Sequence, residues 1–233
     1  MSKAGLLRAL GACLLTVWSL APIPALSASG LFGEDEILQT TGMERFDKWN
    51  DMLARFVAQQ PKSDKQPCQT DLMPIAGTPR PLDFCKLTPW REFVQVTKRQ
   101  TMSPDVLTEV NRFLNKSPYV EDVVNFGTRD YWETPSEIMN FSGDCEDFAI
   151  AKYYTLKAIG VNPNSMRVVA VLDLNLNLGH AVLLVRLNNE NYILDNQFDG
   201  AIPASRVKHY QAVYSINEGQ WWKHIQGLPK LTR

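Results

Sequence analysis

The feature of this sequence that most restricts its fold is a change of pattern at Gly160. Before Gly160, apolar residues recur at three- and four-residue intervals, which is typical of helices with one buried face. After it, short runs rich in Val, Ile, Leu, Tyr and Trp are separated by Asn, Gly and Pro, which is typical of strands joined by tight connections. Helices followed by antiparallel strands predict an α+β fold with the helices packed against one antiparallel β-sheet.

The helical part divides into an arm, a connecting segment and a helical core. An apolar stripe of Phe46, Trp49, Leu53 and Phe56 predicts an amphipathic N-terminal helix within 42–59, and residues 61–87 form a Pro-rich irregular segment. N-cap residues followed by Pro predict further helices. These are expected at 89–100, at 104–115 and, as a short helix, from Thr134. A largely apolar pattern that starts near Cys145 and stops at Gly160 predicts a central buried helix.

Five strands are expected in the second part, with hairpin loops at 188–191 and 217–219. Their ranges are 167–174, 180–187, 192–197, 212–216 and 220–225.

The first 27 residues predict a secretory signal peptide. They contain Lys3 and Arg8, no acidic residue, and an apolar run at 9–20 that ends in small residues. The run is too short and too interrupted by Pro for a confident membrane span. Leu10–Cys13 is a weaker alternative, a lipoprotein acceptor site, but it precedes most of the apolar run. We expect cleavage after Ser27 or Ala28, leaving one domain over 28–233.

Composition places the full chain among ordinary globular proteins. Basic and acidic residues nearly balance, 24 against 25, and no long Lys/Arg block could attract a polyanion. Nucleic acid is therefore a poor first hypothesis for a partner.

The cysteines that follow the signal peptide are Cys68, Cys85 and Cys145. Cys68 and Cys85 flank a Pro-rich loop, which suits a loop-closing disulfide in an oxidising compartment. The alternative is that all three thiols are free, buried and inert.

Cys145 is expected in the first turn of the central helix. There the backbone N–H groups and the helix dipole stabilise a thiolate, so the position suits a nucleophile. Three neighbouring carboxylates, Asp144, Glu146 and Asp147, oppose this because like charge raises the pKa of the thiol.

Two interpretations of these carboxylates remain open. In the first they complement the helix dipole and face water. In the second they bind a hard cation such as Ca²⁺, which would cancel their repulsion of a thiolate. The spacing is not that of an EF-hand, so the residues alone give only a weak metal prediction.

A cysteine nucleophile needs a base and a group that orients the base. Of three histidines, His180 begins an apolar strand, and Asp195 ends the partner strand across the hairpin. A two- or four-residue loop places Asp195 on the same face as His180, at a diagonal position. His209 and His224 lie in polar surroundings and are expected at the surface.

Three short motifs together resemble a known family. They are Gly143-Asp-Cys-Glu-Asp147, Gly179-His-Ala-Val182 and Leu194-Asp-Asn196, and the resemblance covers most of the mature chain. It is to the bacterial transglutaminase-like cysteine proteinases of the LapG type. This resemblance implies a papain/transglutaminase-like fold with Cys145 as nucleophile, His180 as general base and acid, and Asp195 as the residue that orients His180.

The resemblance further implies that Asp144, Glu146 and Asp147 supply Ca²⁺ ligands. It implies a periplasmic, Ca²⁺-dependent endopeptidase that cuts a large surface adhesin near its N-terminus, at a paired-alanine site, and so promotes biofilm dispersal. An inner-membrane receptor that senses cyclic di-GMP would sequester the protease. The Cys68–Cys85 disulfide is not implied by the family.

Two other functions remain open. The same triad could transfer acyl groups, as in transglutaminases, or the chain could be a non-catalytic calcium-binding module. For the second oxyanion donor, Asn125, Tyr131 and Trp132 are the candidates, although core packing is the better expectation for Trp132.

Overall fold

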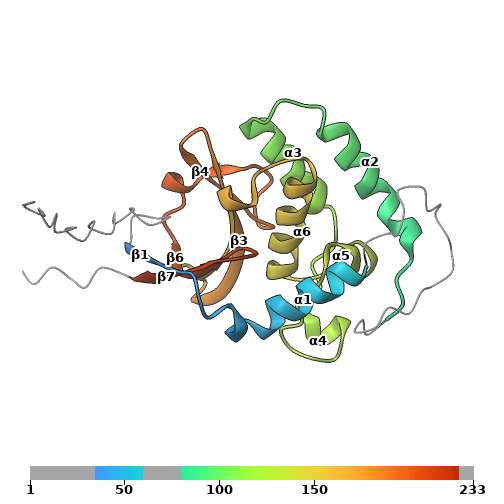
Figure 1. The fold of residues 1–233 in the computed structure, drawn as a ribbon, viewed down its shortest axis with the longest axis horizontal. Coiled ribbons are helices and arrows are strands. Elements are labelled where there is room, and N and C mark those ends of the chain that lie inside the picture. The colour runs from blue at the N-terminus through green and yellow to red at the C-terminus, as the bar shows by residue number, and fades with distance from the viewer. Residues whose placement is uncertain (1–34, 60–79, 226–233) are drawn as a thin grey trace, which may run out of the picture.

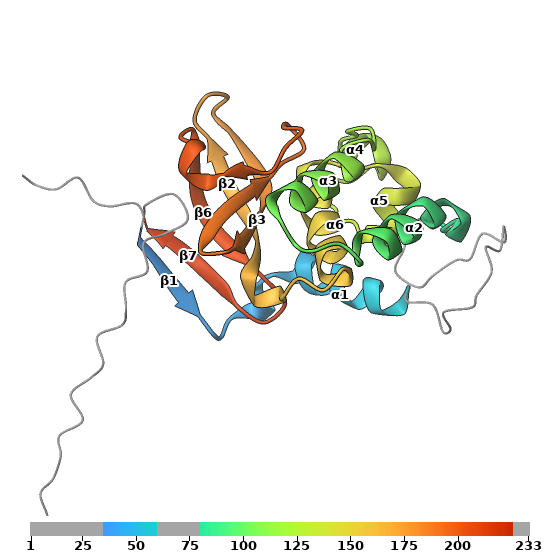
Figure 2. The same cartoon turned by 90° about the horizontal axis from the view of Figure 1, so that it is seen from above.

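The computed structural model describes residues 35–59 and 80–225. They form an α+β fold in which six α-helices lie on one side of a seven-stranded antiparallel sheet (Figures 1 and 2). The predicted fold class is therefore confirmed. The predicted signal peptide, most of the Pro-rich segment and Cys68 lie outside the described residues.

The helices agree with the predicted ranges to within a few residues, apart from one that was not expected. Short 3₁₀ turns occur at Met43–Arg45, Phe84–Leu87, Pro163–Ser165 and Ala204–Arg206. The α-helices are α1 (Asp47–Ala58), α2 (Thr88–Thr97), α3 (Pro104–Leu114), α4 (Asp122–Asn125), α5 (Pro135–Phe141) and α6 (Cys145–Ala158). The unexpected helix, α4, is a single turn.

The sheet has the strand order β1-β7-β6-β2-β3-β4-β5. Sequence patterns predicted five of its members but neither β1 nor β5. The strands are β1 (Asp35–Gln39), β2 (Met166–Asp173), β3 (Leu178–Leu187), β4 (Glu190–Leu194), β5 (Ile202–Pro203), β6 (Tyr210–Ile216) and β7 (Trp221–Ile225).

Two predicted helix starts are seen in the side-chain contacts. Ser103 Oγ accepts the N–H of Val106 at the start of α3. Thr134 and Glu137 form a reciprocal capping box at the start of α5. Thr88, by contrast, is the first residue of α2 and not its cap. Its helix begins one residue early because the preceding 3₁₀ turn leads directly into it.

Helix α1 turns the predicted apolar stripe to the core, together with two buried residues that were not predicted. Trp49, Met52 and Arg55 are its buried side chains, while Phe46, Leu53 and Phe56 are partly buried against the core. The apolar stripe was recognised, but the burial of Arg55 was not, because its ionic partner lies 82 residues further along the chain.

Helix α6 is the centre of the fold, as expected. Its residues from Asp147 to Leu156 are all buried, and it packs against β3, α5 and α3. Its last residue is Ala158, and Ile159 is its C-cap. The next residue, Gly160, has a φ of 104°, which suits a residue without a Cβ. The buried helix therefore places its first residue, Cys145, at the junction between the helices and the sheet.

The hairpin of β3 and β4 sets the register of the predicted catalytic pair. Asn188 and Asn189 form a two-residue turn with positive φ at both positions, as a type I′ turn requires. Leu187 pairs with Glu190 and Leu183 with Leu194. Continued by one residue, this register places Asp195 opposite position 182. This is the position expected for the shorter, two-residue loop.

Two further predictions concern His224 and Cys85. The expected surface position of His224 is wrong: the residue is 6% exposed, and its Nε2 lies 3.0 Å from Ser215 Oγ inside the sheet. Polar neighbours in the sequence misled the prediction because alternate strand residues face opposite ways. Cys85 is disulfide-bonded, whereas Cys145 is a free thiol.

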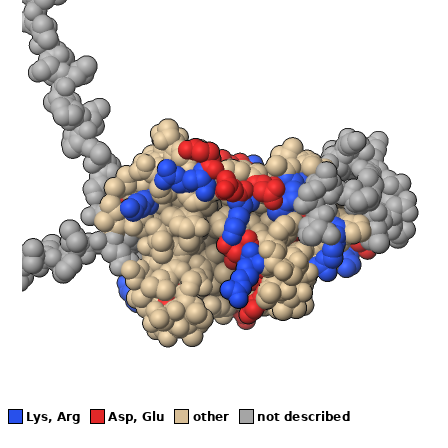
Figure 3. Space-filling model, turned by 90° about the horizontal axis from the view of Figure 1, so that it is seen from below, with Lys and Arg blue, Asp and Glu red and all other residues tan. Residues whose placement is uncertain are grey.

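Among residues 35–59 and 80–225, no helix is both long and apolar enough to span a bilayer. On the face of the molecule shown in Figure 3, Lys and Arg side chains lie among Asp and Glu side chains.

Candidate active site

The segment that carries Cys145 is held by a capping box at the start of α6. Asp147 Oδ2 accepts the N–H of Asp144 at 2.9 Å, and Asp144 in turn caps the helix. Gly143 permits this arrangement, because a Cβ on it would lie 2.4 Å from Asp147 Oδ2. The local sequence thus fixes the nucleophile candidate at a helix N-terminus through a buried carboxylate.

The surroundings of Cys145 favour the protonated thiol. Burial raises its pKa most, followed by the charge of Glu146, and the thiol donates to Glu146 Oε2 at 3.1 Å. The backbone N–H of Ala181 acts in the opposite direction by donating to the sulfur. The like-charge effect expected from the sequence is therefore present and comes mainly from Glu146.

His180 and Asp195 form a directly bonded pair. His180 Nε2 lies 2.9 Å from Asp195 Oδ1, and the His180 side chain is 7% exposed. Tyr210 Oη donates to the other carboxylate oxygen at 2.6 Å, and the N–H of Gln197 donates to Oδ1 at 2.9 Å. Burial alone would raise the pKa of Asp195, but these hydrogen bonds, that of His180 foremost, lower it below the usual value.

Cys145 and this pair meet at the edge between helix and sheet. Ala181, whose N–H reaches the sulfur, directly follows His180 on β3. Because Nε2 of His180 is bound to Asp195, Nδ1 is the ring nitrogen left for proton exchange. The structure thus brings a thiol, an imidazole and a buried carboxylate together from α6, β3 and the end of β4.

The acidic residues around Cys145 form two overlapping groups. Asp144, Cys145 and Glu146 offer ligand atoms within 4.8 Å of one another, and so do Asp122, Asp144 and Asp147. Asp147 is fully buried, so the water-facing alternative does not hold for it. Its two oxygens accept the N–H groups of Glu133 and Asp144.

These carboxylates repel one another strongly. Burial raises the pKa of Asp144 to about 8, and the charge of Glu146 adds to this shift. Burial also raises the pKa of Asp122 to about 6, although the Tyr131 N–H opposes it. Burial and the charge of Glu137 raise the pKa of Glu133 to about 9.

Unpaired oxygens show that this cluster fits a cation. Within the described residues, Asp122 Oδ1, Asp144 Oδ1 and Glu133 Oε2 are buried without a hydrogen-bond donor. Carboxylate oxygens are the ligands that Ca²⁺ takes, and a divalent ion would relieve both the repulsion and the missing donors. Asp122 and Glu133 were missed by sequence reasoning because they lie on a separate segment with no local metal-binding pattern.

The three residues considered for the second oxyanion contact have other partners. The Asn125 amide donates to Glu133 Oε1 at 3.1 Å and to Ser142 O at 2.8 Å. Tyr131 Oη donates to Glu137 at 3.3 Å, and the Trp132 indole donates to Asp130 at 2.8 Å. Trp132 also packs edge-on against Trp49, in agreement with the core packing expected for it.

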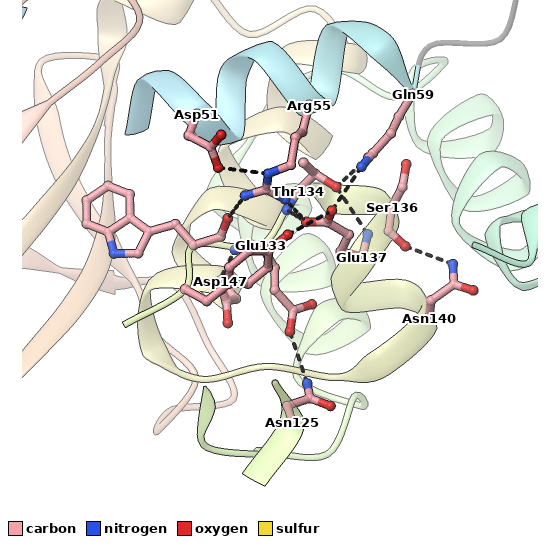
Figure 4. Close-up of polar contacts among 12 residues, drawn as sticks. Asp51, Arg55, Gln59, Asn125, Glu133, Thr134, Ser136, Glu137, Asn140 and Asp147 are labelled. Carbon is pink, nitrogen blue, oxygen red and sulfur yellow. Dashed lines mark hydrogen bonds and ion pairs between the residues drawn. The ribbon is translucent and has the colours of Figure 1, made fainter. Parts of the chain in front are cut away.

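A second polar network lies behind the acidic cluster, and Figure 4 shows this network together with Glu133 and Asp147. Arg55 reaches from α1 to Glu137 and to the backbone oxygen of Trp132, with Asp51 on its outer side. Gln59 donates to Glu137 at 3.0 Å. This network ties α1 to the segment that ends in Glu133, and so supports one wall of the acidic cluster.

Residues 82–228 match the family model described as bacterial transglutaminase-like cysteine proteinase. The chain belongs to this family. No significant match to this chain was found among curated proteins. Membership establishes a cysteine proteinase with a transglutaminase-like fold, in agreement with the α+β architecture.

Solved structures of LapG from Legionella pneumophila resemble the chain. One is 34% identical over 60% of this chain and 78% of LapG, with a TM-score of 0.53. The calcium-bound LapG structure is 32% identical, covers 64% of this chain and 84% of its own, and has a TM-score of 0.55. An EGTA-treated form is 35% identical over 59% and 75%, with a TM-score of 0.52.

Proposed function

We propose that this protein is a Ca²⁺-dependent cysteine endopeptidase with Cys145 as nucleophile, His180 as general base and acid, and Asp195 as the orienting carboxylate. The observation that carries the proposal is the 2.9 Å bond between His180 and Asp195 beside a free thiol at the start of α6. Membership of a cysteine proteinase family supports it.

In the proposed reaction, His180 takes the proton of Cys145 as the sulfur attacks a peptide carbonyl. The C–N bond breaks, His180 gives that proton to the leaving amine, and a thioester on Cys145 remains. His180 then takes a proton from water as its oxygen attacks the thioester carbonyl, the C–S bond breaks, and His180 returns the proton to the sulfur to restore the thiol. Asp195, fixed by Tyr210 and Gln197, holds the imidazole in one orientation throughout.

Calcium would be held by Asp144 and Glu146, with Asp147 and Asp122 contributing from the buried side. When bound, the ion supplies positive charge next to the nucleophile and so lowers the pKa of the thiol. The calcium-bound structure of the LapG relative supports this assignment.

The biological role follows from the LapG resemblance and is proposed on that basis. The substrate is the N-terminal region of a large surface adhesin, whose cleavage releases the adhesin and promotes biofilm dispersal. The protease acts in the periplasm after removal of the signal peptide, and an inner-membrane receptor that senses cyclic di-GMP sequesters it.

The decisive experiment is incubation of purified mature protein with candidate adhesin N-terminal fragments, in Ca²⁺ and in EGTA. We expect cleavage only with Ca²⁺, and mass spectrometry should find two products with free termini. Cys145→Ala should remove all cleavage while the variant still binds the fragment. Cleavage by Cys145→Ala would exclude Cys145 as nucleophile, an amide adduct would indicate a transferase, and binding without turnover would indicate a calcium-binding module.

A further inference from the structure

Lys152 is a buried cation that the proposed mechanism does not use. It lies in α6, its exposed fraction is 0%, and within the described part of the chain its Nζ has no hydrogen-bond partner. Nζ lies over the face of the Phe148 ring, 5.6 Å from the ring centroid. An ammonium buried in this way costs several kcal/mol, so its retention calls for a compensating role.

The position of Lys152 on α6 directs it toward the catalytic pair. Lys152 follows Cys145 by seven residues, so the two lie on nearly the same face of the helix, about 10 Å apart along its axis. Helical side chains lean toward the helix N-terminus, which brings the lysine amine back toward the Cys145 end. That face of α6 packs against β3, the strand that carries His180.

The charged group that acts on Lys152 is Asp195. Burial lowers the pKa of Lys152 to about 7, and the negative charge of Asp195 is the effect that opposes the decrease. Helix α3, which also packs against α6, contributes neutral amides here: Asn115 donates to the backbone oxygen of Asp195 at 2.9 Å, and Asn111 donates to that of Phe198. The charge of one buried carboxylate, Asp195, therefore acts on both Lys152 and His180.

We propose that Lys152 is the buried counter-charge of Asp195 and acts as a positioning residue for His180. Asp195 is 1% exposed, and while His180 is neutral its negative charge would otherwise have no cation beside it. The lysine keeps the carboxylate ionised, and an ionised carboxylate holds the imidazole in the tautomer that donates from Nε2. This inference extends the proposed triad but can be tested without a substrate.

The test replaces Lys152 with Met, which has a similar shape and no charge. Because Asp195 then loses its buried counter-charge, we expect the melting temperature to fall. Because a positive charge near the pair is lost, NMR titration of the imidazole should give a His180 midpoint about one pH unit higher. Both measurements are made in saturating Ca²⁺, and the chain has only three histidines to assign.

Thr155→Val is the matched control. Thr155 is a buried polar residue of the same helix, and its hydroxyl is bound to Ala151 O and to the Trp90 indole. Its loss should lower the melting temperature and leave the His180 midpoint unchanged. If an adhesin substrate is in hand, Lys152→Met should lower kcat about tenfold with KM unchanged.

An unchanged His180 midpoint in Lys152→Met, or a melting temperature equal to or above that of the wild type, would overturn the proposal. If the Met variant does not fold, Lys152→Gln gives the same readout, and failure of both variants would show that Lys152 is simply required by the fold. These results are independent of the proposed function: a protein that cleaves no adhesin but shows the shift would refute the activity and leave the counter-charge in place.

Discussion

Two buried carboxylate sites lie next to each other in this protein and are neutralised in different ways. Glu137 is surrounded by donors from the protein itself: the Arg55 guanidinium, the Gln59 amide and the Thr134 N–H. The cluster of Asp122, Asp144 and Glu133 retains buried oxygens without donors. The first site is thus complete with donors from the chain itself, whereas the second is the site at which we propose that a cation binds.

The largest expected effect comes from changing the second site. Asp144→Asn should remove Ca²⁺ binding and all Ca²⁺-dependent cleavage, because Asp144 belongs to both groups of potential ligands. Calorimetric Ca²⁺ titration and the adhesin assay measure the two effects. Asp51→Asn, which alters an exposed carboxylate of the first network, is the control and should bind Ca²⁺ normally. Full activity of Asp144→Asn, or of the wild type in EGTA, would contradict the assignment.

The first site should instead respond through stability. Arg55→Met leaves Glu137 buried without its cation, and we expect the free energy of unfolding to fall by about 3–5 kcal/mol. Urea denaturation in EGTA measures the loss. Asp51→Ala removes only the exposed partner of Arg55 and should cost less than about 1 kcal/mol. Equal losses from the two variants would mean that the buried pair of Arg55 and Glu137 contributes no more to the free energy of unfolding than the exposed pair.

A smaller effect is expected where the cluster depends on close packing. Gly143→Ala would force a Cβ into Asp147, so we expect a loss of about 1–3 kcal/mol together with weaker Ca²⁺ binding. Differential unfolding with and without Ca²⁺ separates the two. Gly219→Ala, where an added Cβ meets no atom within 4 Å, is the control. A Gly143→Ala protein with wild-type stability and affinity would show that the capping carboxylate can move freely.

The smallest effect is a change in pH dependence. The folded pKa values of Asp122 and Asp144, about 6 and about 8, lie above the ordinary value of 3.8. The folded state therefore holds protons that the unfolded chain has lost, and in EGTA the stability should decrease as pH rises from about 4 to about 8. Saturating Ca²⁺ should flatten this part of the curve, as thermal unfolding across pH would show. Parallel curves in EGTA and Ca²⁺ would argue against a cation at this cluster.

Local patterns were sufficient for much of the fold and for the pairing of His180 with Asp195. The even length of the Asn188–Asn189 turn and the period of two along a strand predict from the sequence that His180 and Asp195 lie on one face of the hairpin. The caps at Ser103 and Thr134 were also visible, because a cap involves residues only a few positions apart.

Long-range contacts could not be read in the same way. Asp122 and Glu133 join the acidic cluster from a segment about 10 to 20 residues upstream, and Arg55 meets Glu137 across 82 residues. Strand β1 was missed because it pairs with β7, which lies at the opposite end of the chain. His224 was misplaced for a related reason, since its buried partner Ser215 belongs to the neighbouring strand.

The division of the proposed triad between α6 and the sheet has a mechanical consequence. His180 and Asp195 sit on one hairpin and are bonded to each other, whereas Cys145 belongs to a helix of the other layer. Any sliding of the helical layer over the sheet would therefore alter the approach of sulfur to imidazole and leave the imidazole–carboxylate bond untouched. Force or ligand binding at the helices is thus a route by which reactivity could be adjusted without disturbing the base.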